Sequence, residues 1–279
     1  MKELTIKSPA KINIGLNIIS KREDGYHNLE TIFYPINLCD ELTIREDSKF
    51  ALITNNSQLN IENDNTITKA RDLICELTGI EIKGSVTLNK RIPIGAGMGG
   101  GSSDGAAALL LFNKFYDLKL TNEDLYSLAL KIGSDVPYFI DPKSKFASSR
   151  GERFESIKLK IDGPILLVNP GIHISTSWAF SKIKPKIPET HLNLIEFGVR
   201  NSLSKFRNCI VNDFEYAVFE SYPEIKGIKD KMYSLGAEFS LMTGSGSTVF
   251  GIFPDELSAQ KATIEFPINY FTFIERQIN

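Results

Sequence analysis

One stretch decides how this chain folds: Pro93-Ile94-Gly95-Ala96-Gly97-Met98-Gly99-Gly100-Gly101-Ser102-Ser103-Asp104. It follows a short apolar strand at 86–88 and leads into a helical run at 105–112. Glycine permits positive φ and lacks the Cβ that keeps a ligand at a distance, so successive N–H groups can converge on one anion. One of the three polar residues that end the stretch can cap the helix, whose positive dipole end faces the same anion. The stretch therefore predicts a phosphate-binding loop.

Three other interpretations of this loop are weaker. No Gly-Lys-Ser/Thr closes it, which argues against a Walker A loop. Gly95, Gly97 and Gly100 match G-x-G-x-x-G, but more helix follows where a dinucleotide-binding fold has a second parallel strand. A turn without a ligand is disfavoured, because consecutive glycines before a good helix cost conformational entropy without a packing gain.

Length and composition indicate a globular protein of one large or two ordinary domains. The chain has 279 residues, of which 42% are apolar and 24% charged, and its formal net charge is −2. This charge offers no basic surface for nucleic acid. The N-terminus lacks an apolar signal core, and no apolar stretch approaches the roughly 20 residues of a membrane span. We therefore expect a cytoplasmic protein without a nucleic-acid or membrane partner.

Cysteines and histidines are few and widely separated. Cys39, Cys75 and Cys209 predict buried thiols, because an odd number at these spacings suits neither a disulfide framework nor a zinc site. The three histidines are equally scattered, which argues against a histidine-based metal centre.

Residues 4–19 alternate as a half-buried strand does. Apolar side chains occupy one face, and the other carries Lys11 and Asn13, which should sit side by side. On the residues alone, Lys11 lies either on a solvated strand face or in a ligand-binding wall. A turn at Asp24-Gly25 then starts a second strand, with Tyr26 and His27 at its beginning.

Standard signals place the remaining elements. Asn65, Thr121 and Asp135 stand at helix starts, and a turn-rich stretch at 142–164 marks a domain boundary. We expect Ser175 or Thr176 to open a short helix that carries Phe180, and Ser221 to cap a helix at 223–235. Pro254 or Asp255 should open a last helix to Phe266. A hairpin brackets Gly244 and Gly246, with further strands at 165–168 and 270–274.

Three segments of the chain resemble the GHMP kinases, which phosphorylate small molecules such as galactose, homoserine and mevalonate. They are the glycine-rich loop, the segment near Lys11 and the segment near Gly244, in the expected order and over most of the chain. Gly-x-Asp-Val-Pro at Asp135 is similar to the same family. Asp24-Gly25-Tyr26-His27 resembles the members whose substrates carry a cytidine diphosphate group.

The resemblance implies an α+β, two-domain GHMP kinase fold. A mixed α/β ATP-binding domain would span residues 1–155, and a ferredoxin-like domain would span residues 156–279. The implied enzyme uses ATP and Mg²⁺ to phosphorylate the 2-hydroxyl of 4-diphosphocytidyl-2-C-methyl-D-erythritol, in the non-mevalonate isoprenoid route. Alternatives are another kinase or a diphosphate decarboxylase of the same family, or a non-catalytic nucleotide or metabolite sensor.

The resemblance also assigns site residues. Asp135 would be the base, and Lys11 would keep it ionised and orient the attacking oxygen. ATP would contact Pro93, Ile94, Gly95, Ala96, Gly97, Met98, Gly99, Gly100, Gly101, Ser102 and Ser103, together with Asn65 and Lys90. The cytidine-bearing substrate would contact Asn13, Tyr26, His27, Phe180, Gly244 and Gly246. Phe180 is equally explained as a core aromatic, and Asn65 as a helix cap.

Asp104 departs from the family pattern, which often has asparagine at this position. A further negative charge beside a triphosphate is unfavourable unless it caps the helix or contacts Mg²⁺. The residues that hold Mg²⁺ are therefore not identified by the sequence.

Overall fold

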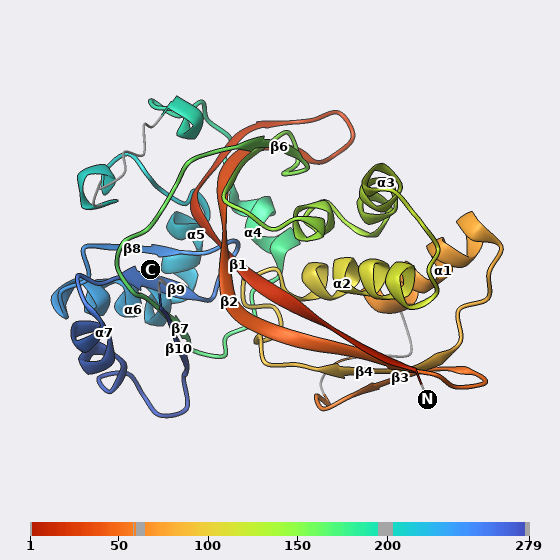
Figure 1. Cartoon of the computed structure of the whole chain (residues 1–279). Coiled ribbons are helices and arrows are strands. Elements are labelled where there is room, and N and C mark those ends of the chain that lie inside the picture. Colours follow the sequence, from red (N-terminus) through yellow and green to blue (C-terminus); the bar gives the residue numbers. More distant parts are fainter. Residues whose placement is uncertain (1, 58, 60–64, 195–202, 277–279) are drawn as a thin grey trace. The chain divides into compact units, whose positions relative to one another are not determined.

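The computed structural model describes residues 2–57, 59, 65–194 and 203–276 (Figure 1). The chain forms two compact units, each built from several segments. The first contains Met1–Ala10, Ile36–Ile94 and Gly99–Pro142, and the second contains Lys11–Pro35, Gly95–Met98 and Lys143–Asn279. The two longest strands and the glycine-rich stretch therefore contribute residues to both units. The predicted division at residue 155 stays a prediction.

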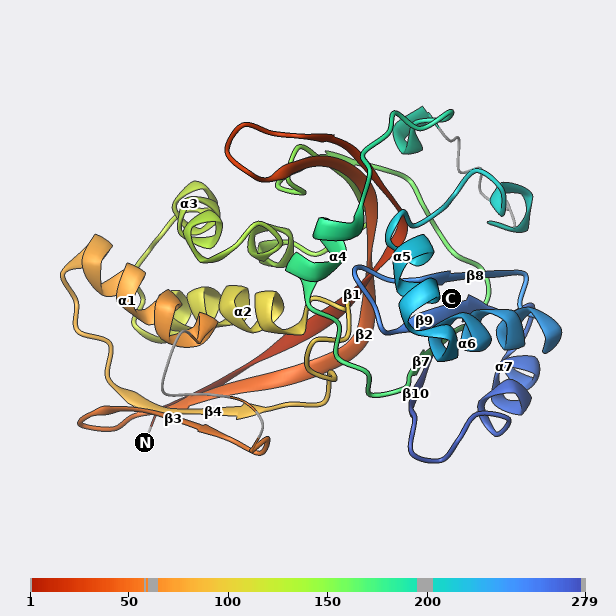
Figure 2. The same cartoon turned by 180° about the vertical axis from the view of Figure 1, so that it is seen from behind.

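The first unit packs helices on one side of a small sheet. The long strands β1 (Glu3–Lys21) and β2 (His27–Arg45) pair with each other. Strand β4 (Gly84–Asn89) pairs antiparallel with β2 and parallel with β3 (Phe50–Thr54). Helices α1 (Thr66–Thr78), α2 (Gly100–Phe115) and α3 (Asn122–Ile132) lie on one side of β3 and β4, as Figures 1 and 2 show. A 3₁₀-helix, η1 (Val136–Ile140), packs against α2 and α3.

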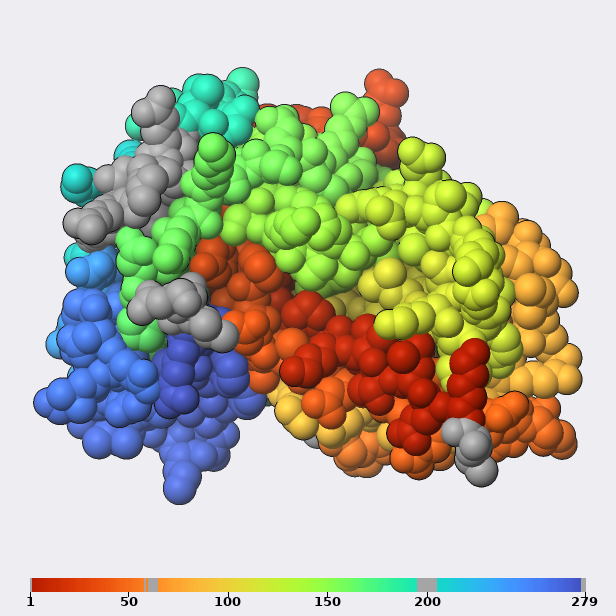
Figure 3. Space-filling model, in the orientation of Figure 1, coloured from red at the N-terminus to blue at the C-terminus, as the bar shows by residue number. Residues whose placement is uncertain are grey.

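The exposure of side chains changes along β1. Its first residues alternate between exposed and half-buried side chains from Glu3 to Lys7, and Figure 3 shows this end of the chain, in red, at the surface. From Ser8 to Leu16 nearly every residue is buried. Strand β1 is therefore a surface strand at its start and an interior strand where it carries Lys11 and Asn13.

The second unit contains an antiparallel four-stranded sheet with a ferredoxin-like order. Its strands are β7 (Ile165–Asn169), β8 (Phe239–Met242), β9 (Val249–Ile252) and β10 (Phe271–Glu275), hydrogen-bonded in the order β10-β7-β9-β8. Helix α6 (Pro223–Ser234) contacts β8 and β9, and α7 (Glu256–Thr263) contacts β7 and β10. This is the ferredoxin-like domain that the resemblance implies. The two outer strands of its sheet, β8 and β10, follow helices α6 and α7 in the chain.

Shorter elements complete the second unit. Strand β5 (Lys145–Ser148) pairs antiparallel with Thr31–Phe33 of β2, and β6 (Arg153–Ser156) pairs with β5. The helices are α4 (Thr176–Lys182), α5 (Phe214–Ser221) and the 3₁₀-helices η2 (Leu192–Leu194) and η3 (Leu203–Phe206). No helix within the described ranges has the length and apolar character to cross a membrane.

Several predicted helix caps are confirmed. Asn65 accepts the Ile67 N–H at 2.8 Å, and Thr121 forms a reciprocal capping box with Asp124. Ser175 caps α4 and Asp255 caps α7, although α7 ends at Thr263, before the predicted Phe266. Helix α6 starts after Tyr222 without a side-chain cap, so the prediction for Ser221 was wrong.

The predicted cap on helix α2 was also wrong. The helix starts at Gly100, and Gly99 occupies the cap position with φ of 72° and no side-chain hydrogen bond. Ser102, Ser103 and Asp104 therefore lie inside the first turns of the helix and not at its cap position. The predicted burial of all three thiols was wrong as well, because Cys39 and Cys75 are half-buried and Cys209 is exposed.

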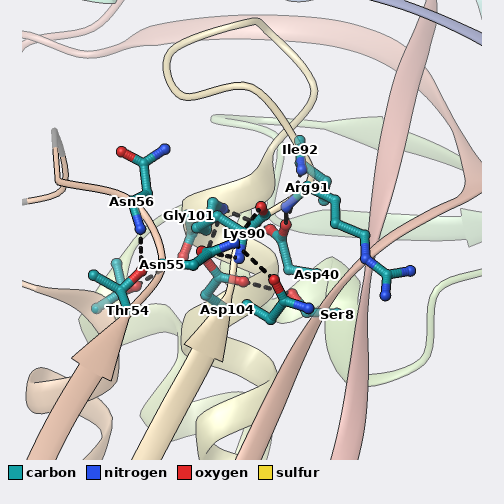
Figure 4. Close-up of polar contacts among 12 residues, drawn as sticks. Ser8, Asp40, Thr54, Asn55, Asn56, Lys90, Arg91, Ile92, Gly101 and Asp104 are labelled. Atoms are coloured by element: carbon teal, nitrogen blue, oxygen red, sulfur yellow. Dashed lines mark hydrogen bonds and ion pairs between the residues drawn. The ribbon is translucent and has the colours of Figure 1, made fainter.

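Asp104 instead joins a buried cluster of charges in the first unit (Figure 4). The Lys90 ammonium lies 2.5 Å from the Asp40 carboxylate and 2.9 Å from the Asp104 carboxylate, and all three side chains are at most 4% exposed. Asp40 also accepts the backbone N–H groups of Arg91 and Ile92, and Ser8 donates to Asp104 at 2.8 Å. The cluster thus ties β1, β2, the end of β4 and the first turns of α2 together.

Two carboxylates share one ammonium in this cluster, and this affects the ionisation of Asp104 and Lys90. Burial raises the pKa of Asp104 to about 6, because desolvation and the neighbouring Asp40 outweigh the attraction of Lys90. Burial alone would lower the pKa of Lys90, but Asp104 and Asp40 together raise it. Lys90 is therefore charged in the folded protein, and Asp104 takes up a proton at a higher pH than an ordinary aspartate.

We expect Asp104→Asn to remove a pH dependence of stability. Between about pH 4 and pH 6 the folded chain binds a proton at Asp104 that the unfolded chain has released, so this group makes the parent less stable as pH rises. As pH rises over that range, the free energy of unfolding of the variant minus that of the parent should therefore increase, by on the order of 1–3 kcal/mol. Urea unfolding at several pH values measures it.

Asp47→Asn, at an exposed carboxylate, serves as the matched control and should change little. An identical pH profile for Asp104→Asn and the parent would contradict the role of this carboxyl.

Candidate active site

The glycine-rich loop alternates between glycines with positive φ and buried apolar residues. Gly95, Gly97 and Gly99 have φ of 64°, 76° and 72°, whereas Ala96 and Met98 are 3% and 1% exposed. The two apolar side chains anchor the loop in the interior, and the left-handed glycines between them make the tight bends. This conformation requires glycine at the alternate positions.

Part of the loop packs directly on the backbone of the β8–β9 hairpin. A Cβ on Gly97 would lie 2.2 Å from the Thr243 carbonyl oxygen, and one on Gly244 would lie 2.8 Å from the Gly97 oxygen. The Thr248 N–H donates to the Ala96 carbonyl at 3.4 Å. Gly97 and Gly244, predicted as ligand-binding glycines, are therefore also required by protein packing.

At the start of α2, the glycine-rich stretch has space beside its backbone and an unpaired hydroxyl. A Cβ on Gly101 would meet no atom within 4 Å, and Gly101 is exposed in the first turn of α2. Ser103 is 1% exposed, and its hydroxyl has no hydrogen-bond partner among the described residues. An open helix terminus with a buried, unpaired hydroxyl provides donors for an anion such as phosphate.

Lys11 is an interior lysine next to this loop. Its side chain is on β1, the residue is 4% exposed, and its ammonium donates to the Asn13 amide oxygen and, at 3.4 Å, to the Gly97 carbonyl. The ammonium also lies 5.0 Å from the centre of the Phe33 ring. Lys11 and Asn13 thus lie side by side, as the strand alternation predicted, and the solvated strand face is excluded.

Asn13 is held by two threonines that the sequence analysis did not identify. Its backbone N–H donates to the Thr243 hydroxyl at 2.9 Å, and its side-chain NH₂ donates to the Thr31 hydroxyl at 2.8 Å. Both threonines are at most 1% exposed. Thr243 stands directly before the predicted glycine turn, but nothing in the sequence distinguishes Thr31 from an ordinary strand threonine.

Asp135 is half-buried at the start of η1, where its side chain makes no capping hydrogen bond. It occupies the N-cap position that the sequence predicted. Asp135 belongs to the first unit and Lys11 to the second. Their cooperation in catalysis stays a prediction.

The residues predicted for the cytidine group are partly brought together. His27 and Phe180 stack with ring centroids 4.9 Å apart and 16° between their planes. Tyr26 is 54% exposed, and the Arg150 guanidinium lies 4.9 Å from its ring centre. Burial, with a smaller contribution from Lys21, lowers the pKa of His27, so its ring is neutral at pH 7 with one donor and one acceptor nitrogen.

Lys90 and Asn65 each have a role within the protein. The Lys90 ammonium belongs to the buried charge cluster, and the Asn65 side chain caps α1. A contact of either with ATP stays a prediction. Asp40, which the sequence analysis missed, could have been noticed as a carboxylate in the apolar row that contains Leu38 and Leu42.

The described residues contain no group of three or more His, Cys, Asp or Glu side chains arranged to hold a metal ion. Asp104, a candidate ligand for Mg²⁺, is occupied by Lys90 and Ser8. This donor set does not fit a metal site made by the protein alone.

Comparisons with known proteins identify the family of the chain. The chain matches the GHMP kinases N terminal domain over residues 65–141 and the GHMP kinases C terminal domain over residues 194–270. It is 44% identical over 265 residues to a 4-diphosphocytidyl-2-C-methyl-D-erythritol kinase of Bacteroides fragilis, covering 92% of this chain and 94% of the relative. The corresponding kinase of Chlorobium limicola is 40% identical over 266 residues, covering 94% and 92%.

Solved structures give the same result. The crystal structure of a 4-(cytidine 5'-diphospho)-2C-methyl-D-erythritol kinase superposes with a TM-score of 0.83 at 30% identity, covering 98% of both chains. A homoserine kinase from Cytophaga hutchinsonii shares the fold, with a TM-score of 0.76 at 17% identity over 99% of this chain and 95% of that one. The chain therefore belongs to the 4-diphosphocytidyl-2-C-methyl-D-erythritol kinases of the GHMP kinase family.

Proposed function

We infer that this protein transfers the γ-phosphoryl group of ATP to the 2-hydroxyl of 4-diphosphocytidyl-2-C-methyl-D-erythritol. The observation that carries this inference is the buried Lys11 ammonium, fixed by Asn13 and Gly97 against the backbone of the glycine loop. Lysine is rarely buried in proteins, because removing its charge from water is costly, so a buried lysine indicates a functional role. Beside a loop that suits phosphate, this charge serves a reaction that accumulates negative charge.

Phosphoryl transfer depends on positioning and charge stabilisation more than on covalent chemistry. The N–H groups at the start of α2 and the Ser103 hydroxyl would bind phosphate oxygens of ATP. Lys11 would orient the acceptor oxygen, and Asp135 would accept the proton of the attacking hydroxyl. Because an alcohol is a weak acid, alignment of the reacting atoms would contribute more than early proton transfer.

The exposed Tyr26 ring and the stacked pair of His27 and Phe180 would recognise the cytosine. Aromatic faces stack on a base, and the neutral His27 ring can donate to or accept from the edge of the base. Mg²⁺, which we propose as a cofactor, would neutralise phosphate charge with the nucleotide itself supplying oxygen ligands. We propose a cytoplasmic location for the enzyme.

The base and the lysine can be tested together. Asp135→Asn keeps the shape but removes the proton acceptor, and Lys11→Ala removes the charge. We expect each to lower kcat by about 10²–10⁴, measured as ADP formed with the cytidine-bearing substrate. Asp141→Asn, at the other end of η1, is the control. If both variants turned over within about tenfold of the parent, the assigned roles would be wrong.

Replacing Phe180 by alanine should weaken binding of the cytidine-bearing substrate. Loss of a stacked ring costs roughly 1–3 kcal/mol, so we expect KM for this substrate to rise about 10- to 100-fold while KM for ATP stays constant. Trp178→Ala, on the same helix, removes a ring that packs on Tyr222 and should leave both constants near the parent values. Equal effects of Phe180→Ala on both substrates would argue for a core role of Phe180.

Two glycine variants separate packing from ligand binding in the loop. Gly97→Ala introduces a Cβ against the Thr243 carbonyl at positive φ, and we expect a loss of about 2 kcal/mol or more in unfolding free energy. Gly101→Ala adds a methyl in open space on a helix, so stability should be kept or rise by up to about 1 kcal/mol.

If phosphate lies against this turn, Gly101→Ala should nevertheless raise KM for ATP. Thermal unfolding and steady-state kinetics measure the two effects. An unchanged KM for ATP in this stable variant would place the nucleotide elsewhere.

A further inference from the structure

We propose that Thr31 is a positioning residue for Lys11, acting through the side-chain amide of Asn13. The inference rests on the proposed function, because it concerns how the lysine of that reaction is held. All the residues involved belong to the second unit. The hydroxyl of Thr31 holds the Asn13 amide with its oxygen toward the ammonium.

The hydrogen bonds of Thr31 make it an acceptor toward Asn13. Its hydroxyl donates its single proton to the Gly15 carbonyl, with an oxygen-to-oxygen distance of 2.6 Å. The same oxygen accepts from the Asn13 NH₂ group at 2.8 Å. Since a hydroxyl has only one proton to give, Thr31 can act toward Asn13 only as an acceptor.

This requirement fixes the orientation of the Asn13 amide. With the NH₂ group on Thr31, the amide oxygen faces Lys11 and accepts from its ammonium. In the flipped amide, the NH₂ group would face the ammonium, and the oxygen would face a hydroxyl whose proton is already used. Two groups would be left unsatisfied in a place where Asn13 and Thr31 are each 1% exposed, which is strongly unfavourable.

Thr243 cannot make this choice. Its hydroxyl accepts the Asn13 backbone N–H at 2.9 Å, and its proton has two acceptors at similar distance: the Asn13 amide oxygen at 3.3 Å and the Gly97 carbonyl at 3.2 Å. If the amide flipped, Thr243 could donate to Gly97 alone and lose nothing. The orientation is therefore selected by Thr31 together with the Lys11 ammonium, which can only donate.

The consequence for the reaction is the position of one charge. Lysine has a flexible four-carbon stem, so its ammonium stays in place only while its acceptors do. The Asn13 oxygen and the Gly97 carbonyl are two such acceptors, and Thr31 maintains the first. Loss of the Thr31 hydroxyl should reduce kcat with little change in KM, because Thr31 itself is placed on neither substrate.

The test compares three threonine variants by steady-state formation of ADP. Thr31→Val keeps the shape and removes the hydroxyl, and we expect kcat about tenfold lower with both KM values near those of the parent. Thr31→Ser restores the hydroxyl and should recover most of kcat. Thr43→Val makes the same change on the same strand, where the hydroxyl pairs with Thr5, and should match the parent.

The outcomes are distinct. A kcat within about twofold of the parent for Thr31→Val, or an equal loss in Thr31→Ser, overturns the proposal. If Thr31→Val does not fold, Thr31→Ala and Thr31→Ser provide the same comparison, with melting temperatures recorded for each. A parent chain that forms no ADP overturns the proposed function itself, whereas an active parent with an unaffected Thr31→Val removes only this role.

Discussion

The close approach of two backbone segments, 95–98 and 243–248, is the constraint on which the candidate site depends. No side chain separates them at Gly97, where a Cβ would lie 2.2 Å from the Thr243 carbonyl. This contact brings the Gly97 carbonyl to the Lys11 ammonium and the Thr243 hydroxyl to Asn13. A chemically simple feature, the absence of a Cβ, thus allows one buried lysine to be held by backbone and side-chain oxygens together.

Burial makes this arrangement specific. In water, an amide such as that of Asn13 could rotate freely between its two orientations. In the interior each donor and acceptor needs a partner, so the accepting Thr31 hydroxyl on one side and the donating Lys11 ammonium on the other select one orientation. Two of the groups that hold the Lys11 ammonium, the Asn13 amide oxygen and the Gly97 carbonyl, carry no charge themselves.

In the first unit, the cluster around Lys90 is held together by paired charges. Lys90 compensates two buried carboxylates, and Asp40 also binds the backbone N–H groups that lead into the glycine loop. Such a cluster fixes segments firmly when every group is partnered, but it leaves one carboxyl inclined to take up a proton. Asp104 therefore stabilises the start of α2 through Lys90 and Ser8, and not as a helix cap.

The sequence by itself determined the fold class and several local features of the chain. Hydrophobic alternation identified β1 and placed Lys11 beside Asn13, and local signals identified the caps Asn65 and Thr121, because these depend on neighbours within a few residues. Only the tertiary structure decided that Lys11 is buried, that Asp104 pairs with Lys90, and that Thr31 and Thr243 hold Asn13. These contacts join residues 14 to 230 positions apart, and a partner at such separation leaves no periodic signal in the chain.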